Sequence, residues 1–210
     1  MAITVPAVQW SRERSRAAAC QNNLKQLGVA LVNFHSQFGH LPKDGKNGHG
    51  YAAFLLPQLE QMALYERLQP LTKQLSGEPQ ARDRGGDASL SAFLCPSFDG
   101  PPLVDSNGLG RSNYLASAEL FSKSTQLPNV GDGLSNTIAL GETVRDQAWV
   151  LPGTGTGGAP PNQGDFGSRH AAGAHFLFCE GSVRLIGNTI DPSTFSALFT
   201  PNGQEVVDDF

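Results

Sequence analysis

The chain has 210 residues, enough for one domain of ordinary size with a substantial apolar core. Charged residues make up 16% of it and apolar residues 39%, a balance that excludes a highly charged disordered protein. The formal net charge of −4 provides no general positive field for a polyanion, so nucleic acid is not expected as a partner.

The clearest periodic pattern lies near the N-terminus and predicts a long amphipathic helix over about residues 5–38. Apolar side chains recur there at spacings of four and three residues: Cys20, Leu24, Leu27, Leu31, Phe34 and Phe38. Gly39 and Pro42 end the pattern. A helix of about 50 Å, at 1.5 Å per residue, is longer than a compact domain of this size needs. We therefore expect its first third, which lacks an apolar stripe, to project.

No membrane-spanning or targeting segment is predicted from the residues given. The longest apolar run near the N-terminus, residues 2–8, is far shorter than the roughly 20 residues that span a bilayer. A basic n-region and a full h-region are both missing, so we read no signal peptide. The chain as given is expected to be soluble.

A second helical stretch is predicted over residues 51–68, interrupted by Pro57, which can start a short helix. The side chains of this stretch that are expected to face inward are Leu55, Leu59, Met62 and Tyr65. Residues 70–89 are polar and rich in Gly, Arg and Asp, and we interpret them as a variable surface excursion.

The second half of the chain consists of short apolar runs separated by Gly, Pro, Asn and Asp, which is typical of strands and turns. The predicted strands cover residues 93–95, 113–118, 137–141, 175–179 and 182–186, the last two forming a hairpin. Gly181 can supply the positive φ that its turn requires. Residues 153–164 are predicted as a flexible loop, and Asp191 as the cap of a last helix over 193–199. These elements predict one α+β domain over residues 1–210, with the helix packed on an antiparallel sheet.

The patterns that carry catalytic or ligand chemistry are weak. The glycine-rich residues 153–158 lack the Lys-Ser/Thr of a P-loop. The loop that contains Asp132, Gly133 and Asn136 has one carboxylate where a calcium loop has several, so a tight turn is favoured. We therefore predict no cofactor and no catalytic residue, and no nucleophile elbow is present.

His170, His175 and Glu180 recur every five residues, which suits neither one helical face nor one strand face. No metal site is predicted from them, and the favoured interpretation is a structural turn at Glu180 and Gly181. Cys20, Cys95 and Cys179 are too few for a disulfide scaffold and too scattered for a paired-cysteine zinc motif. One disulfide with one free thiol is possible.

Several separate motifs resemble those of one large bacterial family of prepilin-like proteins, related to type II secretion pseudopilins. The stretch PAVQWSRERSRAAACQNNLKQ is similar to the family's PAVQ and Cys-x-Asn-Asn-Leu-Lys-Gln pattern. The resemblance continues with LLPQLEQMALYERL, FLCPS, SNYLAS and GDGLSNTIALGE, which ends at Glu142. The last matching segment contains His170, nine residues and Glu180-Gly181, similar to the family's His, nine residues, Asp-Gly.

Three features depart from the family pattern. Glu180 replaces Asp, Phe98 stands where an Asp usually follows CPS, and only ITVPAV corresponds to the end of the transmembrane segment. The family's leader and most of that segment have no counterpart in the residues given.

The resemblance implies a type IV pilin-like fold and a non-enzymatic component of the bacterial cell envelope. The intact form would be anchored in the inner membrane through the missing N-terminal segment, with a periplasmic globular part. Its partners would be other pilin-like subunits or secretion machinery. The resemblance also implies a Cys20–Cys95 disulfide, since both residues lie in family-like motifs and the implied compartment is outside the cytoplasm; two buried thiols are the alternative.

A second function stays open for the same fold. Variable polar loops on a rigid scaffold suit recognition, so a soluble binding module could use residues 70–89, 100–111 and 153–165 to hold a protein or a glycan.

Overall fold

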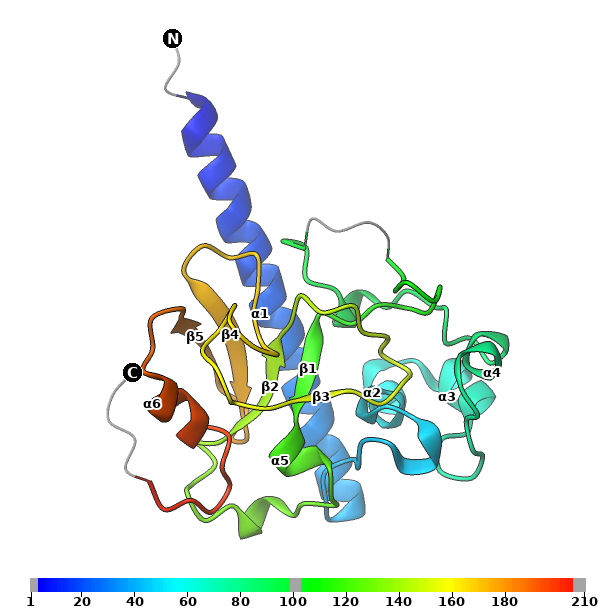
Figure 1. The fold of residues 1–210 in the computed structure, drawn as a ribbon. Coiled ribbons are helices and arrows are strands. Elements are labelled where there is room, and N and C mark those ends of the chain that lie inside the picture. The colour runs from blue at the N-terminus through cyan, green and yellow to red at the C-terminus, as the bar shows by residue number, and fades with distance from the viewer. Residues whose placement is uncertain (1–3, 99–102, 206–210) are drawn as a thin grey trace.

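A long helix and a five-stranded sheet dominate the computed structural model, which describes residues 4–98 and 103–205 (Figure 1). The helix α1 (Thr4–Phe38) has 35 residues. Its N-terminal part extends beyond the sheet and leaves Val8 and Trp10 exposed. The predicted long helix and the α+β class are therefore confirmed. Within the described residues, no helix combines the length and the apolar character needed to cross a membrane.

The C-terminal part of α1 packs on the sheet through the predicted apolar stripe. Its buried members are Cys20, Leu24, Leu27, Leu31 and Phe34. The prediction was wrong for Phe38, whose side chain remains 38% exposed. Phe38 is the last residue of α1, and the chain turns away at Gly39, so only part of its ring is covered, by Phe34 at 4.4 Å between ring centroids.

The sheet has the strand order β3-β1-β2-β4-β5. The strands are β1 (Tyr114–Ser117), β2 (Ile138–Glu142), β3 (Thr154–Gly155), β4 (Gly173–Phe178) and β5 (Val183–Gly187). All neighbours are antiparallel except β3, which pairs in parallel with β1 through Ala116 and Thr154. The prediction of a purely antiparallel sheet was therefore wrong, and the predicted loop over 153–164 was wrong at Thr154 and Gly155 only. A strand of two residues has no periodicity for a sequence to display; its pairing depends on the free edge of β1.

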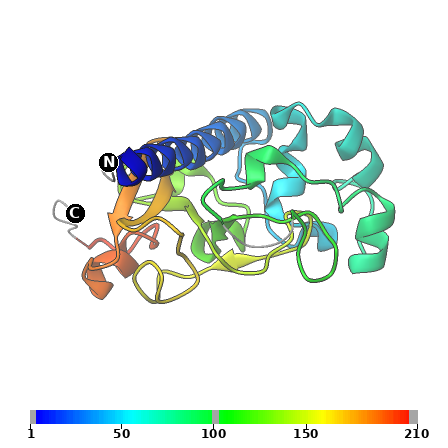
Figure 2. The ribbon, with the colours of Figure 1, turned by 90° about the horizontal axis from the view of Figure 1, so that it is seen from above.

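Both faces of the sheet are covered, as Figure 2 shows with α1 on one side and α6 (Pro192–Ala197) on the other. In β4, Leu177 belongs to the core cluster that includes α1, whereas Phe176 and Phe178 belong to the cluster that includes α6. Alternate residues of a strand point to opposite faces, so all six residues of β4 are buried. At Gly28 a Cβ would lie only 2.8 Å from Cδ1 of Leu177, so glycine permits the close approach of α1 to β4.

The remaining helices are short: α2 (Tyr51–Leu55), α3 (Met62–Leu68), α4 (Glu78–Asp83) and α5 (Ala118–Phe121), with 3-10 turns at Lys46–Gly48, Leu56–Leu59, Ser91–Phe93 and Leu127–Asn129. The predicted strand over 93–95 was wrong, because a 3-10 turn ends at Phe93. Met62 was expected to face inward and is 51% exposed, because a new helix begins there after the break at Glu60 and Gln61.

The hairpin between β4 and β5 turns at Glu180 and Gly181, where Gly181 has a φ of +94°. The amide of Gly181 donates to the carbonyl of Phe178 (2.8 Å). The predicted hairpin is confirmed, and so is the last helix, since Asp191 accepts hydrogen bonds from the amides of Ser193 and Thr194.

We expect Gly181→Val to lower the free energy of unfolding by about 1–3 kcal/mol, because a β-branched residue is strained at positive φ. A Cβ at this position meets no atom within 4 Å, so the loss comes from the backbone alone. Gly181→Asn is the matched control, since asparagine tolerates positive φ. Chemical denaturation measures both variants, and equal stability of the two would contradict this explanation.

Candidate functional site

A buried group of carboxylates and imidazoles lies where α1, the end of β2 and the start of β4 meet. We call it the carboxylate–histidine cluster, and it consists of Glu13, Glu142, His170 and His175. The side chains of Glu142, His170 and His175 are at most 9% exposed, and Glu13 closes the cluster from α1 with 36% exposure. Such groups are rarely buried unless they are paired.

Glu142 is the centre of this cluster. Its Oε1 lies 3.2 Å from Nε2 of His170, and its Oε2 lies 3.1 Å from Nδ1 of His175. The backbone amide of His175 donates a third hydrogen bond to Oε2 (2.7 Å). Glu142 is the last residue of β2, which lies between β1 and β4, and this central position in the sheet explains its burial.

Glu13 extends the cluster to the long helix. Its Oε1 accepts a hydrogen bond from Ser97 (2.8 Å) and lies 2.9 Å from Nδ1 of His170. Its other oxygen pairs with Arg16, one turn along α1, at 2.6 Å. The projecting part of α1 is therefore tied to the segment before β4 by a carboxylate–imidazole pair across 157 residues of sequence.

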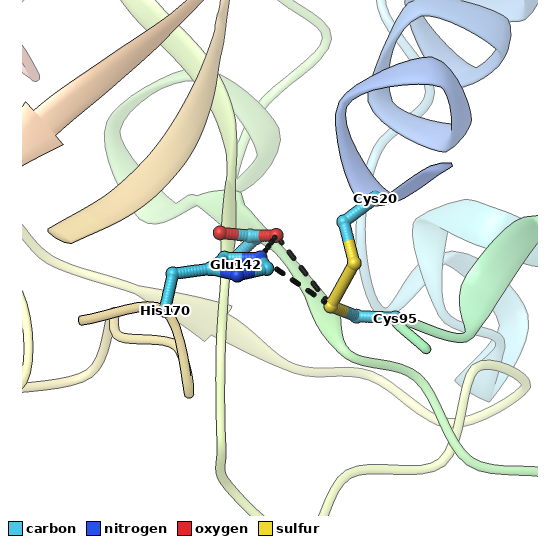
Figure 3. A group of neighbouring side chains, drawn as sticks. All are labelled: Cys20, Cys95, Glu142 and His170. Carbon is cyan, nitrogen blue, oxygen red and sulfur yellow. Dashed lines mark hydrogen bonds and ion pairs between the residues drawn. A yellow bond between two sulfur atoms is a disulfide. The ribbon is translucent and has the colours of Figure 1, made fainter. Parts of the chain in front are cut away.

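The Cys20–Cys95 disulfide lies against the cluster (Figure 3). Sγ of Cys95 is 3.7 Å from Oε1 of Glu142 and 3.7 Å from Nε2 of His170. Asn113 positions this segment, since its side-chain oxygen accepts a hydrogen bond from the amide of Cys95 (3.0 Å). Five of the six family-like motifs thus meet in one place, each with a polar or sulfur-containing residue: Cys20, Cys95, Asn113, Glu142 and His170.

The neighbours of each group determine its pKa. The hydrogen bond to Glu142 raises the pKa of His170 above its ordinary value; burial opposes this, and Glu13 adds to it. Burial alone would raise the pKa of Glu142, but the hydrogen bonds to His170 and His175 outweigh it and hold that pKa below the ordinary value. The same holds for Glu13, where burial is outweighed by its bonds with His170, Ser97 and Arg16. These shifts favour an imidazolium between two carboxylates.

We expect the free energy of unfolding to be highest between the ordinary pKa values of Glu and His, 4.5 and 6.5. The raised pKa of His170 gives a stabilisation that is complete below 6.5 and is lost as pH rises through its folded-state pKa. The lowered pKa values of Glu13 and Glu142 give a stabilisation that is present above 4.5 and is lost as pH falls.

Urea unfolding at a series of pH values measures this profile. His170→Asn should weaken the decline on the alkaline side, and His40→Asn, which changes a histidine outside the cluster, is the control. If His170→Asn kept the full alkaline decline, the assignment to His170 would be wrong.

The other residues singled out in the sequence lie elsewhere. Asp132 accepts hydrogen bonds from the amides of Gly203 (2.6 Å) and Gln204 (2.8 Å) and so holds the C-terminal segment. In the same loop, Gly133 has a φ of +93°, and the side-chain amide of Asn136 donates to the carbonyl of Asp132. Glu180 is exposed in the hairpin turn and contacts Ser182 and Arg184. These groups have structural contacts of their own and are not part of the cluster.

The structure pairs His170 with Glu142 and Glu13, and not with Glu180. The side chain of His170 therefore makes long-range contacts, whereas its backbone amide donates a local hydrogen bond to Oγ of Ser168 (3.0 Å). Sequence reasoning missed Glu13, Ser97 and the role of His175. Glu13 has no signal in the local pattern, because it lies among arginines on a helix segment that reads as solvated.

The arrangement can hold a proton between two carboxylates, but it is closed to larger molecules. A cavity beside Glu142, lined also by Thr143, Gly167 and Ser168, measures about 10 Å³, room for about one water molecule. A second pocket, of about 430 Å³, is lined by Cys95 together with Ala19, Phe98 and Arg111.

Thiol counting under denaturing, non-reducing conditions is expected to give one reactive cysteine. Cys20 and Cys95 are joined in the structure, and Cys179 is a buried free thiol whose pKa burial raises to about 12. After reduction the count should rise to 3, the number of cysteines in the chain. The Cys179→Ala variant should give no reactive thiol before reduction. Three reactive thiols in the unreduced protein would contradict the disulfide.

A family model described as "Protein of unknown function (DUF1559)" matches residues 9–126 and 149–193, most of the chain. No curated protein and no solved structure matches it.

Proposed function

The chain belongs to the DUF1559 family, which is associated with pilin-like proteins, and from this premise we propose that it is a non-enzymatic, pseudopilin-like component of the bacterial cell envelope. In this proposal the long helix links the protein to its assembly, and the sheet domain forms a periplasmic head. The partners are other pilin-like subunits or the secretion machinery, and the anchor is an apolar segment that continues α1 at its N-terminal end.

The observation that carries the proposal is the division of α1 into two parts. From Cys20 onward its apolar stripe is used by its own sheet. From residue 8 to residue 19 the side chains of the helix are exposed or half-buried, and Val8 and Trp10 are 48% and 62% exposed. As an isolated peptide, this exposed segment would be only marginally stable as a helix. Here it is helical because it continues the packed part of α1. Such an extension suits contact with other helices.

The carboxylate–histidine cluster supports the same function. Glu13 lies in the projecting part of α1, and its bonds to His170 and Ser97 hold that part in a defined direction relative to the sheet. A fixed direction is what a subunit needs if its helix is to pack in register with those of its neighbours. The enclosed position of Glu142 and His170 fits a structural role better than a catalytic one.

Site-specific photo-crosslinking in cells that carry the whole protein tests the proposal. A photoreactive residue in place of Trp10 is expected to capture pilin-like subunits or secretion proteins, and the exposed Lys73 is the control position. The proposal fails if Trp10 captures nothing above the Lys73 level.

The alternative function is a binding module, and one observation favours it. A groove of about 870 Å³ lies between α1 and two other segments, with Lys25, Gln26 and Val29 on one wall and 58–61 and 89–93 on the other. Its volume is in the range of ligand sites. Among the described residues of the predicted loops, only Ser89 lines this groove. Two of these loops also contain regular structure, α4 in 70–89 and β3 in 153–165. A photoreactive residue in place of Gln26 would test this function. Crosslinks from this position and not from position 10, to a protein unrelated to pilins, would favour a binding module over assembly.

A further inference from the structure

Four atoms that could bind a metal ion lie within 4.8 Å of one another beside the sheet. They are Sγ of Cys20, Sγ of Cys95, a carboxylate oxygen of Glu142 and a ring nitrogen of His170. Figure 3 shows Glu142 and His170 beside the sulfur of Cys95, which is bonded to that of Cys20. Ligands on a tetrahedral ion with bonds of 2.0–2.3 Å are about 3.5 Å apart, so small side-chain movements would complete the geometry.

The two ligands that are not sulfur are already oriented by other groups. Nδ1 of His170 is engaged by Glu13, so its Nε2 is the ring nitrogen that faces Oε1 of Glu142 (3.2 Å) and the sulfur of Cys95 (3.7 Å). Oε2 of Glu142 is engaged by the backbone and ring of His175, so its Oε1 is the oxygen that faces Nε2 of His170 and the same sulfur. A metal-bound histidine typically bonds to a carboxylate through its other nitrogen, and a metal-bound carboxylate is itself hydrogen-bonded. These supporting contacts from Glu13 and His175 are present although the two sulfur atoms are bonded to each other.

The ligand types select the metal. Two sulfurs, one imidazole and one carboxylate suit Zn²⁺ in four-coordinate geometry, whereas Ca²⁺ and Mg²⁺ prefer oxygen ligands alone. We infer that Cys20 and Cys95, once reduced, form a zinc site with Glu142 and His170. The disulfide and the zinc-bound form exclude each other, because both sulfur ligands take part in the S–S bond. This inference differs from the sequence-based expectation that the chain holds no metal.

The chemistry balances with a dithiol as the reductant. One of its thiolates attacks Sγ of Cys95, which breaks the Cys20–Cys95 bond and releases the Cys20 thiolate. The second thiolate of the reductant then attacks the reductant's own sulfur in the mixed disulfide, which releases the Cys95 thiolate and leaves the reductant as a cyclic disulfide. Two electrons and two protons have then passed to Cys20 and Cys95. On zinc binding the two thiols and the imidazolium release protons to solvent, and Nε2 of His170 is freed for the metal. The pocket that reaches Cys95 gives the reductant access, since Cys20 is fully buried.

Cobalt titration tests the inference on the whole chain. The protein is reduced with dithiothreitol without oxygen, the reductant is removed, and Co²⁺ is added as a spectroscopic probe for Zn²⁺. We expect one equivalent to bind with the charge-transfer and ligand-field bands of tetrahedral thiolate-bound cobalt, and Zn²⁺ to displace it. The oxidised protein should show no such bands.

Variants separate this site from adventitious binding. Glu13→Gln should weaken zinc binding about 10- to 100-fold, the usual effect of losing a group that orients a ligand. His170→Ala should abolish the tetrahedral cobalt spectrum, and Cys179→Ala is the control that leaves it unchanged, because this thiol lies outside the four-ligand group. Circular dichroism shows whether each variant is folded.

A second measurement needs no variant. Zn²⁺ should protect Cys20 and Cys95 of the reduced wild-type protein from alkylation, without protecting them after chelation. Cobalt bands that persist in His170→Ala, equal binding to the oxidised protein, or alkylation that zinc does not slow would each overturn the inference.

Discussion

Removal of the Cys20–Cys95 disulfide is expected to lower the free energy of unfolding by about 4.5 kcal/mol, by the chain-entropy relation for a closed loop. The two cysteines are 75 residues apart, so the bond closes a large loop in the unfolded chain and restricts its conformations strongly. It also joins α1 to the segment before β1, beside the carboxylate–histidine cluster. The double variant Cys20→Ala/Cys95→Ala, compared with wild type by urea denaturation, measures the loss.

Two controls accompany this measurement. A reductant should destabilise the wild type by a similar amount when zinc is absent, and should not affect the double variant. Zn²⁺ added to the reduced wild type should restore part of the stability, because binding to the folded state alone stabilises it. A loss under about 1 kcal/mol in the double variant would show that the loop-closure account does not apply.

Glu142→Ala is expected to cost about 3–5 kcal/mol, the range observed when one partner of a buried ion pair is removed. Glu142 has an exposed fraction of 1%, and its carboxylate is bonded to His170 and His175 together. Its loss leaves two imidazoles and a backbone amide without their acceptor in a region that water hardly reaches. Stability measured by urea denaturation should also lose much of its pH dependence.

An exposed carboxylate and a double-mutant cycle provide the controls for this variant. Glu119→Ala removes an exposed carboxylate and should change stability by less than about 0.5 kcal/mol. A double-mutant cycle with His170→Ala measures the coupling between Glu142 and His170 directly. Additive effects of the two substitutions would mean that the pair observed in the structure contributes no energy of its own.

The local elements of the fold could be predicted from the sequence, because each depends on residues close together in the chain. The spacing from Cys20 to Phe34 determined the buried face of α1. Gly181 determined the hairpin turn, since it supplies the positive φ, and Asp191 determined the start of α6, since its carboxylate caps the first amides. In all three cases the physical cause acts between residues that are close together in the chain.

The tertiary structure alone decided which of these elements meet. Glu13 and His170 are 157 residues apart, and nothing in their local sequence favours a contact. The parallel edge strand β3 exists because β1 offers an unpaired edge. Met62 and Phe38 are 51% and 38% exposed, because no later segment among the described residues covers them fully. The sequence marked Glu142, His170 and the cysteines as residues of separate motifs. Only the packing of α1 against β2 and β4 makes them one site, because burial, which creates their interactions and shifts their pKa values, is a property of the assembled core.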